Sequence, residues 1–152
     1  MTATNHVLTG VVLLSIIHNP AIGLPVALVS HVLLDMFPHF GNELKQAKSF
    51  TLILFSDMTL AALVLLTLFL ARPVHYWLLI AGGVTCASPD LLSIPIYIRM
   101  LRHQAPKKLS GLQGFLSRIQ WSESVPGLAV EVVWAMVMSS IVYIRVFLPG
   151  AA

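Results

Sequence analysis

The sequence predicts an all-α, polytopic membrane helix bundle with four to five transmembrane helices, forming a single integral membrane domain over residues 1–152. Of the 152 residues, 57% are hydrophobic and only 10% are charged, whereas soluble domains contain about 25% charged residues. The mean hydropathy of +0.87 agrees with this class. The formal charge of +3 is small and its basic residues lie in short loops. We therefore interpret them as topology signals and expect no nucleic-acid partner.

The first apolar region, residues 7–37, is interrupted by Asn19-Pro20 and again by Gly23 and Pro25. Each of its two arms is shorter than the about 20 residues that a helix needs to cross about 30 Å of hydrocarbon. The region forms either two short helices or one long, broken span. The closely spaced prolines favour a short N-terminal helical hairpin.

Three longer apolar regions follow, at residues 50–71, 74–98 and 125–148. We expect a kink or break in the second of these, because it contains Pro89 and Pro95. A polar segment connects the last two regions. Its apolar residues recur at helical spacing, which predicts an interfacial helix at residues 111–119.

The lysines and arginines predict an orientation. With the hairpin counted as two crossings, seven of them lie on one side and two on the other. The positive-inside rule then places the N-terminus and the loops at residues 41–49 and 99–124 in the cytoplasm.

Four of the six acidic residues lie inside apolar segments, and these are Asp35, Asp57, Asp90 and Glu131. A carboxylate in hydrocarbon costs several kcal/mol unless it is paired, protonated, hydrated or bound to a metal. Helix rise places each of them within roughly 13 Å of the same end of the bundle. We therefore expect the four side chains to share one site.

Histidines accompany these carboxylates. His31 and Asp35 are four residues apart and so lie on one helix face; His39 follows, and His6 is expected at the same edge of the membrane. Imidazole and carboxylate at one-turn spacing can present two ligands to a divalent metal. Imidazole ligands favour zinc, with manganese as the alternative.

Each of these residues also has a purely structural interpretation. A His-x-x-x-Asp pair can be a simple hydrogen-bonded pair. Asp57 can cap a loop or pair with Arg99, and Glu131 can accept a hydrogen bond from Trp134. Asp90 can satisfy backbone groups that the preceding proline leaves free.

Three short motifs resemble those of the bacterial inner-membrane proteins known as membrane-bound metal-dependent hydrolases. Residues 5–10 (Asn-His-Val-Leu-Thr-Gly) resemble their Thr-His-x-x-x-Gly opening. Residues 30–35 (Ser-His-Val-Leu-Leu-Asp), followed by Pro-His, resemble their Ser-His-x-x-x-Asp helix. Residues 88–92 (Ser-Pro-Asp-Leu-Leu) are similar to their Leu-Pro-Asp turn.

The resemblance covers the first 40 residues and the surroundings of residue 90. It implies a bacterial inner-membrane location and a metal site at five positions, His6, His31, Asp35, His39 and Asp90. The Arg-Gly-x-Thr-His-Ser element, which supplies a further histidine in many members, is absent from this sequence.

The leading hypothesis is a metal-dependent hydrolase whose site opens to the cytoplasmic leaflet. A bound metal would lower the pKa of water towards about 7 and so supply a nucleophile at neutral pH. Asp57 or Glu131 would act as the general base or would orient a ligating histidine. Arg99, Arg102 and His103 would clamp a phosphate, which would suit a membrane phospholipid or another amphiphilic phosphoester.

Two other classes of function remain open. The buried carboxylates and histidines could form a proton or cation conduit or a small transporter. Alternatively, the chain could be an accessory membrane subunit, in which buried charges fix helix pairing.

Overall fold

The computed structural model describes residues 1–40, 49–102, 111, 114–115, 118, 124 and 126–148. The elements of these residues are helical, without a strand, which confirms the predicted all-α class for the described part of the chain. The predicted helix at 111–119 lies largely outside the described residues. In chain order the elements are α1 (Ala3–Ile16), α2 (Pro20–Asp35), α3 (Ser49–Ala71), α4 (Tyr76–Ala87), η2 (Ser88–Ser93), α5 (Ile94–Leu101), α7 (Gly127–Val142) and η3 (Tyr143–Phe147).

Three helical stretches are long and apolar enough to cross a membrane, Thr51–Ala71, Tyr76–Arg99 and Gly127–Phe147. The predicted hairpin is formed by α1, of 14 residues, and α2, of 16 residues. At 1.5 Å per residue these helices are about 21 and 24 Å long, which is less than the about 30 Å of the hydrocarbon layer. The structure thus supports a membrane protein, and whether the hairpin adds crossings stays a prediction.

The breaks between helices follow from local chemistry. Pro20 occupies the first turn of α2, where its missing N–H costs nothing, and the side chain of Asn19 accepts a hydrogen bond from the Ala21 amide at 3.0 Å. Between α4 and α5, Pro89 removes an amide donor, and the chain tightens into the 3-10 turn η2. This is the region where the sequence predicted a kink or break.

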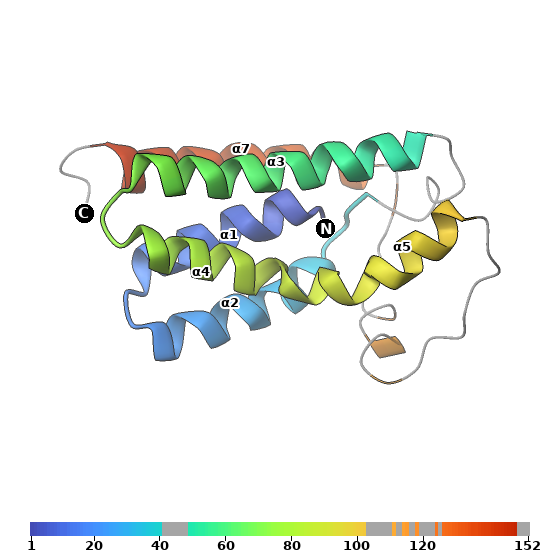
Figure 1. The fold of residues 1–152 in the computed structure, drawn as a ribbon, viewed down its shortest axis with the longest axis horizontal. Helices are drawn as coiled ribbons and strands as arrows, with labels where there is room; N and C mark the ends of the chain where they lie inside the picture. The colour runs from blue at the N-terminus through green and yellow to red at the C-terminus, as the bar shows by residue number, and fades with distance from the viewer. Residues whose placement is uncertain are drawn as a thin grey trace.

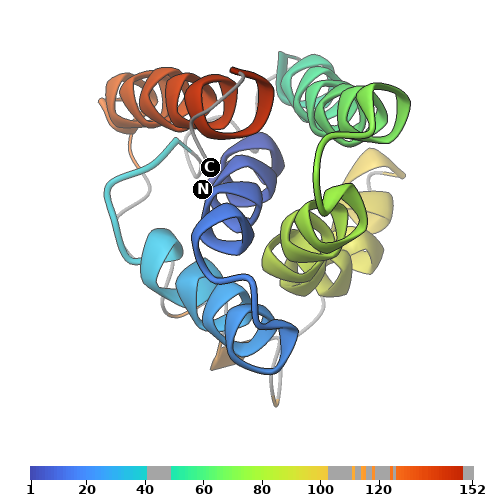
Figure 2. The ribbon, with the colours of Figure 1, turned by 90° about the vertical axis from the view of Figure 1, so that its left-hand side faces the viewer.

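Helix α1 lies at the centre of the bundle. Seen end-on (Figure 2), it is surrounded by α2, α3, α4 and α7, and it contacts all four. Ten of its 14 residues are buried. The outer helices instead expose large apolar side chains such as Leu52 (71%), Leu70 (69%) and Met136 (58%). So much exposed apolar surface is expected of helices that face lipid rather than water.

Glycines let α1 and α4 approach each other closely. A Cβ atom on Gly10 would lie 2.2 Å from the Gly82 carbonyl oxygen, and one on Gly82 would lie 2.7 Å from the Gly10 carbonyl oxygen. Small residues allow such backbone contact between membrane helices, where dispersion forces rather than a hydrophobic effect hold helices together. This contact fixes α4, and therefore η2, against the N-terminal half of α1.

The helix directions place five helix ends together. The N-terminal ends of α1, α3 and α7 and the C-terminal ends of α2 and α4 lie toward one end of the bundle (Figure 1). Residues far apart in the sequence, including those at positions 6, 35 and 90, therefore meet at this end.

We expect Gly10→Ala to destabilise the protein, because the added methyl group overlaps the α4 backbone. Overpacking of this kind typically costs about 1–3 kcal/mol. Thermal unfolding in detergent, followed by loss of the monodisperse size-exclusion peak, measures the effect. Ala129→Val is the control, since Ala129 lies on the exposed face of α7. Equal melting temperatures for the two variants would contradict the close contact.

Candidate metal centre

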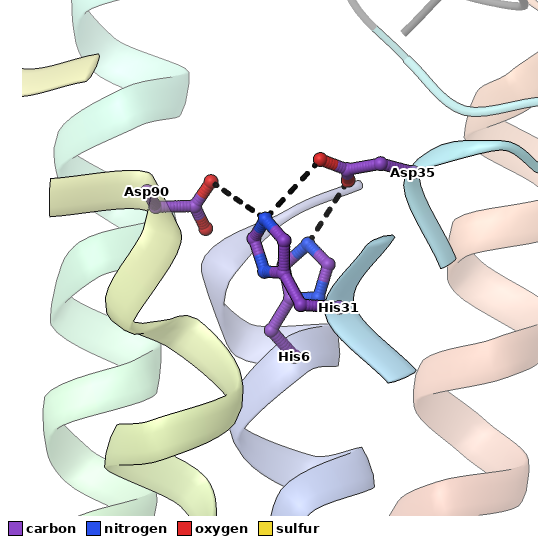
Figure 3. Close-up of side chains that lie close together, drawn as sticks. All are labelled: His6, His31, Asp35 and Asp90. Atoms are coloured by element: carbon purple, nitrogen blue, oxygen red, sulfur yellow. Dashed lines mark hydrogen bonds and ion pairs between the residues drawn. The ribbon is translucent and has the colours of Figure 1, made fainter. Parts of the chain in front are cut away.

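Four side chains from three elements converge at the end of the bundle where these helix ends meet. His6 comes from the first turns of α1, His31 and Asp35 from the last turns of α2, and Asp90 from η2. Each offers one ligand atom, and these atoms all lie within 4.8 Å of one another. Figure 3 shows the two imidazole rings side by side, with a carboxylate on either side of them. We call these four residues the His/Asp cluster.

The contacts within the cluster are made through the same nitrogen of each ring. His6 Nε2 lies 3.1 Å from Asp35 Oδ1, and His31 Nε2 lies 3.3 Å from Asp35 Oδ2 and 3.9 Å from Asp90 Oδ1. The two rings stack with centroids 4.0 Å apart and an interplanar angle of 27°. The Nε2 atoms and the carboxylate oxygens thus face a common space.

The cluster is almost completely removed from solvent. The side chains of His6, His31 and Asp35 are at most 1% exposed, whereas Asp90 is 27% exposed and forms the accessible side. Two carboxylates in such surroundings need a compensating positive charge, because the cost of leaving an unpaired charge in a low-dielectric interior is several kcal/mol.

The donor set fits a divalent transition metal. Bonds of about 2.0–2.2 Å place the ligand atoms of a tetrahedral zinc site about 3.3–3.6 Å apart. The separations of the two imidazoles from Asp35, 3.1 and 3.3 Å, lie close to that range, and the separation of His31 from Asp90 is longer, at 3.9 Å. The widest separation in the cluster exceeds this range, so metal binding would draw the side chains slightly inward. Two imidazoles and two carboxylates are ligands that zinc and manganese accept.

One feature differs from most metal sites. A ligating histidine usually donates its second ring N–H to a carboxylate or carbonyl. Here Nδ1 of both His6 and His31 is buried and has no hydrogen-bond partner among the described residues. Stacking of the two rings and their contacts with Asp35, rather than an outer hydrogen bond, therefore hold the imidazoles.

A positive group already lies at Asp35. The amino nitrogen of Met1 is 2.6 Å from Asp35 Oδ1, and this group is 1% exposed. Asp35 Oδ1 therefore has two nitrogen neighbours, the Met1 amine and His6 Nε2. The Asp35 carboxylate thus already pairs with a cationic group in its buried environment, as it would pair with a bound metal ion.

The sequence placed Asp57 in the site, and the structure shows what its carboxylate contacts. Asp57 on α3 accepts hydrogen bonds from the backbone amides of Ala3 and Thr4, at 2.8 and 3.0 Å. These are two of the amides that the first turn of any helix leaves unpaired. The α1 N-cap residue, Thr2, makes no side-chain cap, so Asp57 caps α1 from a neighbouring helix and holds His6 in place.

Glu131 on α7 also lies outside the cluster and binds backbone. Its Oε1 accepts a hydrogen bond from the Phe40 amide at 3.2 Å, and its carbonyl oxygen accepts one from the Asn5 side chain at 3.2 Å.

His39 is buried and its Nδ1 lies 2.8 Å from the Phe37 carbonyl oxygen. Among the described residues, the group that could hold a metal ion does not include His39.

The proposed phosphate-binding residues are only partly described. Arg99 lies on α5 and Arg102 just after it, whereas His103 lies outside the described residues. Neither arginine is part of the His/Asp cluster. Their role in binding phosphate stays a prediction.

Sequence reasoning missed two interactions that fix α1. Trp134 Nε1 donates a hydrogen bond to Thr9 Oγ1 at 2.9 Å rather than to Glu131. Arg145 donates to the Ser15 hydroxyl at 3.3 Å and to the Ser15 carbonyl oxygen at 3.1 Å. An arginine near the end of an apolar span was a visible signal, but its partner could not be identified without knowing which helix is central.

Comparisons of the chain with family models, with curated proteins and with solved structures found no match. The resemblance to membrane-bound metal-dependent hydrolases is therefore a prediction. The fold and the cluster define the class of this protein as a membrane helix bundle with a buried His/Asp group that could hold a metal ion.

We expect Asp57→Ala to lower stability, because it leaves two amides at the start of α1 without acceptors. Each unsatisfied buried group costs about 1–3 kcal/mol. Asp57→Asn retains one carbonyl oxygen as an acceptor and should lie between the wild type and the alanine variant in melting temperature. Thr67→Val is the control on the same helix, since Thr67 is exposed and its hydroxyl donates to the Leu63 carbonyl of its own helix. Unchanged melting of Asp57→Ala would contradict the capping role.

Proposed function

We propose that the protein is a membrane-embedded, metal-dependent hydrolase whose metal is held by His6, His31, Asp35 and Asp90. The observation that carries this proposal is the convergence of four ligand atoms from three elements within 4.8 Å in a largely buried site. A divalent ion bound there would act as a Lewis acid and would lower the pKa of water towards about 7.

The residues of the cluster divide into buried and accessible ligands. Asp35 contacts both histidines and is fully buried, so it orients the two rings. Asp90 is partly exposed and stands on the opposite side of His31 (Figure 3). A substrate would therefore reach the centre past Asp90. With four protein ligands, the position that a catalytic metal site keeps for water and substrate would have to be a fifth one, and it would lie on this side.

The residues outside the cluster support its geometry. Asp57 and Glu131 bind backbone amides through their carboxylates, and these contacts favour positioning roles for both. Asp57 fixes the first turn of α1, which carries His6. Glu131 binds the Phe40 amide and so fixes the segment that follows α2. Asp35 is the last residue of α2. The general base that takes a proton from the attacking water would then come from the cluster itself. Asp90, its accessible carboxylate, is suited to this role.

A proton or cation conduit has less support. Such a path needs polar groups throughout the membrane depth. Along the central helix the residues between Thr9 and Ser15 are all apolar, and Val11 and Leu14 among them are completely buried. This stretch corresponds to about 9 Å of helix. The carboxylates of the described residues gather at one end of the bundle, as a site requires.

Metal analysis of the purified protein tests the proposal. The affinity tag is placed at the C-terminus and contains no histidine, so that it neither binds metal nor alters the Met1 amino group. We expect about one zinc or manganese ion per chain. His31→Ala and Asp35→Ala should each weaken metal binding by at least about 100-fold, since even loss of an outer partner of a ligand costs about 10–100-fold.

The matched control is His18→Ala. His18 is exposed and pairs with His75 at the far end of the hairpin, with ring centroids 5.6 Å apart. It should retain the metal. Circular dichroism and size-exclusion profiles establish that each variant is folded. Wild-type protein that takes up no stoichiometric metal, even after dialysis against zinc or manganese, would refute the proposal.

A further inference from the structure

An elongated groove runs beside the His/Asp cluster. It has a volume of about 380 Å³ and lies between α3 on one side and the α4–η2–α5 stretch on the other. Sites for small ligands typically measure about 300–1,000 Å³. Asp90 belongs both to the cluster and to the wall of the groove, so the two spaces are adjacent.

The walls of the groove are apolar. Ala62 and Leu65 line it from α3, and Val84 and Ala87 line it from α4. Among the described residues that form its wall, the ionisable side chains are Asp57, Asp90 and Tyr97, and both Asp57 oxygens hold α1 amides. A water-soluble polar ligand would lose its hydrogen bonds against these walls, which makes its transfer into the groove costly.

The mouth of the groove faces outward from membrane-spanning helices. Its rim residues Met58, Val84 and Leu91 are 49%, 47% and 60% exposed. They belong to the stretches Thr51–Ala71 and Tyr76–Arg99, which are long and apolar enough to cross a membrane. In a bilayer that these stretches cross, the mouth would face the hydrocarbon chains.

We propose that the groove binds one hydrocarbon chain of a membrane lipid and holds the polar linkage of that lipid at Asp90. Its shape supports this occupant, because lining residues extend along α3 from Ile53 to Leu65, about 18 Å of helix. An extended chain matches such a length, whereas a compact ligand does not. The chain lies against Ala62, Leu65 and Val84, and the linkage lies beside the cluster.

Hydrolysis of the lipid linkage rests on the proposed function. Binding of the hydrocarbon chain in the groove requires no metal. The substrate class is then a lipid cleaved close to the polar end of a hydrocarbon chain. Lipid binding in the groove also explains why Asp90 is the accessible ligand: it is the one that a lipid in the groove can reach.

Photolabelling of metal-free protein in detergent tests the groove. The probe is palmitic acid that carries a diazirine in the middle of its chain, and labelled peptides are mapped by mass spectrometry. We expect saturable labelling of residues 58–65 and 84–91. Ala62→Trp should fill the groove and weaken labelling at least about 15-fold, because each of two displaced methylenes accounts for about a fourfold change in affinity. Unlabelled palmitic acid should compete.

Ala129→Trp is the matched control, since it adds the same bulk to the exposed face of α7. It should leave labelling unchanged. Val84→Trp fills the groove from the opposite wall and should repeat the loss, so the test does not depend on one variant folding. Labelling that is unsaturable, or that spreads equally over the exposed faces of α3 and α7, would overturn the inference and indicate contact with bulk lipid only.

His31→Ala separates this inference from the proposed function. It should abolish metal binding and leave the saturable labelling intact, because His31 does not line the groove. Labelling as expected in a protein that never holds metal would refute the hydrolase and retain the lipid site. Metal binding without saturable labelling would refute the lipid site alone.

Discussion

The structure depends on a short helix that is buried on all sides within an apolar bundle. The ends of α1 expose amides and carbonyls that no residue of the helix itself can satisfy, and water is scarce at this depth. Neighbouring helices supply the partners: Asp57 binds the first amides, and Arg145 binds the last turn through Ser15. An acid at the N-terminus and a base at the C-terminus also match the helix dipole. Two of the rare charges of this chain thus hold one helix in register.

The His/Asp cluster follows from this arrangement. Because α1 cannot slide along its axis without losing both caps, His6 has a fixed height in the bundle. The close contact between Gly10 and Gly82 fixes α4 against α1, so Asp90 after α4 is brought to the same height. The hairpin returns α2 antiparallel to α1 and places His31 and Asp35 opposite. Rigid helices rather than flexible loops thus carry most of the cluster, which is the usual requirement for a preorganised site.

The helix bundle, the hairpin and part of the His/Asp cluster could be predicted from the sequence, because each follows from residues that are close together in the chain. Charge scarcity and apolar runs predicted the bundle, Asn19-Pro20 predicted the hairpin, and the one-turn spacing of His31 and Asp35 predicted a shared face. The predicted order of membrane crossings then placed Asp90 at the same end of the bundle as His31 and Asp35. The partners of Asp57 and Glu131 were not predictable in this way. Both carboxylates bind backbone amides of distant segments, and only the packing arrangement reveals which amides lack acceptors.

The distribution of charge argues for a site that faces lipid rather than for a path across the membrane. Asp57 and Arg145 cap the two ends of α1, and the apolar stretch between Thr9 and Ser15 separates these ends. The two carboxylates of the cluster, Asp35 and Asp90, differ in their surroundings. Asp35 has the Met1 amine and two imidazoles around it, whereas Asp90 has a long contact with His31 and an open side along the groove. A centre that is closed toward the core and open toward the hydrocarbon is suited to reactants that arrive through the bilayer.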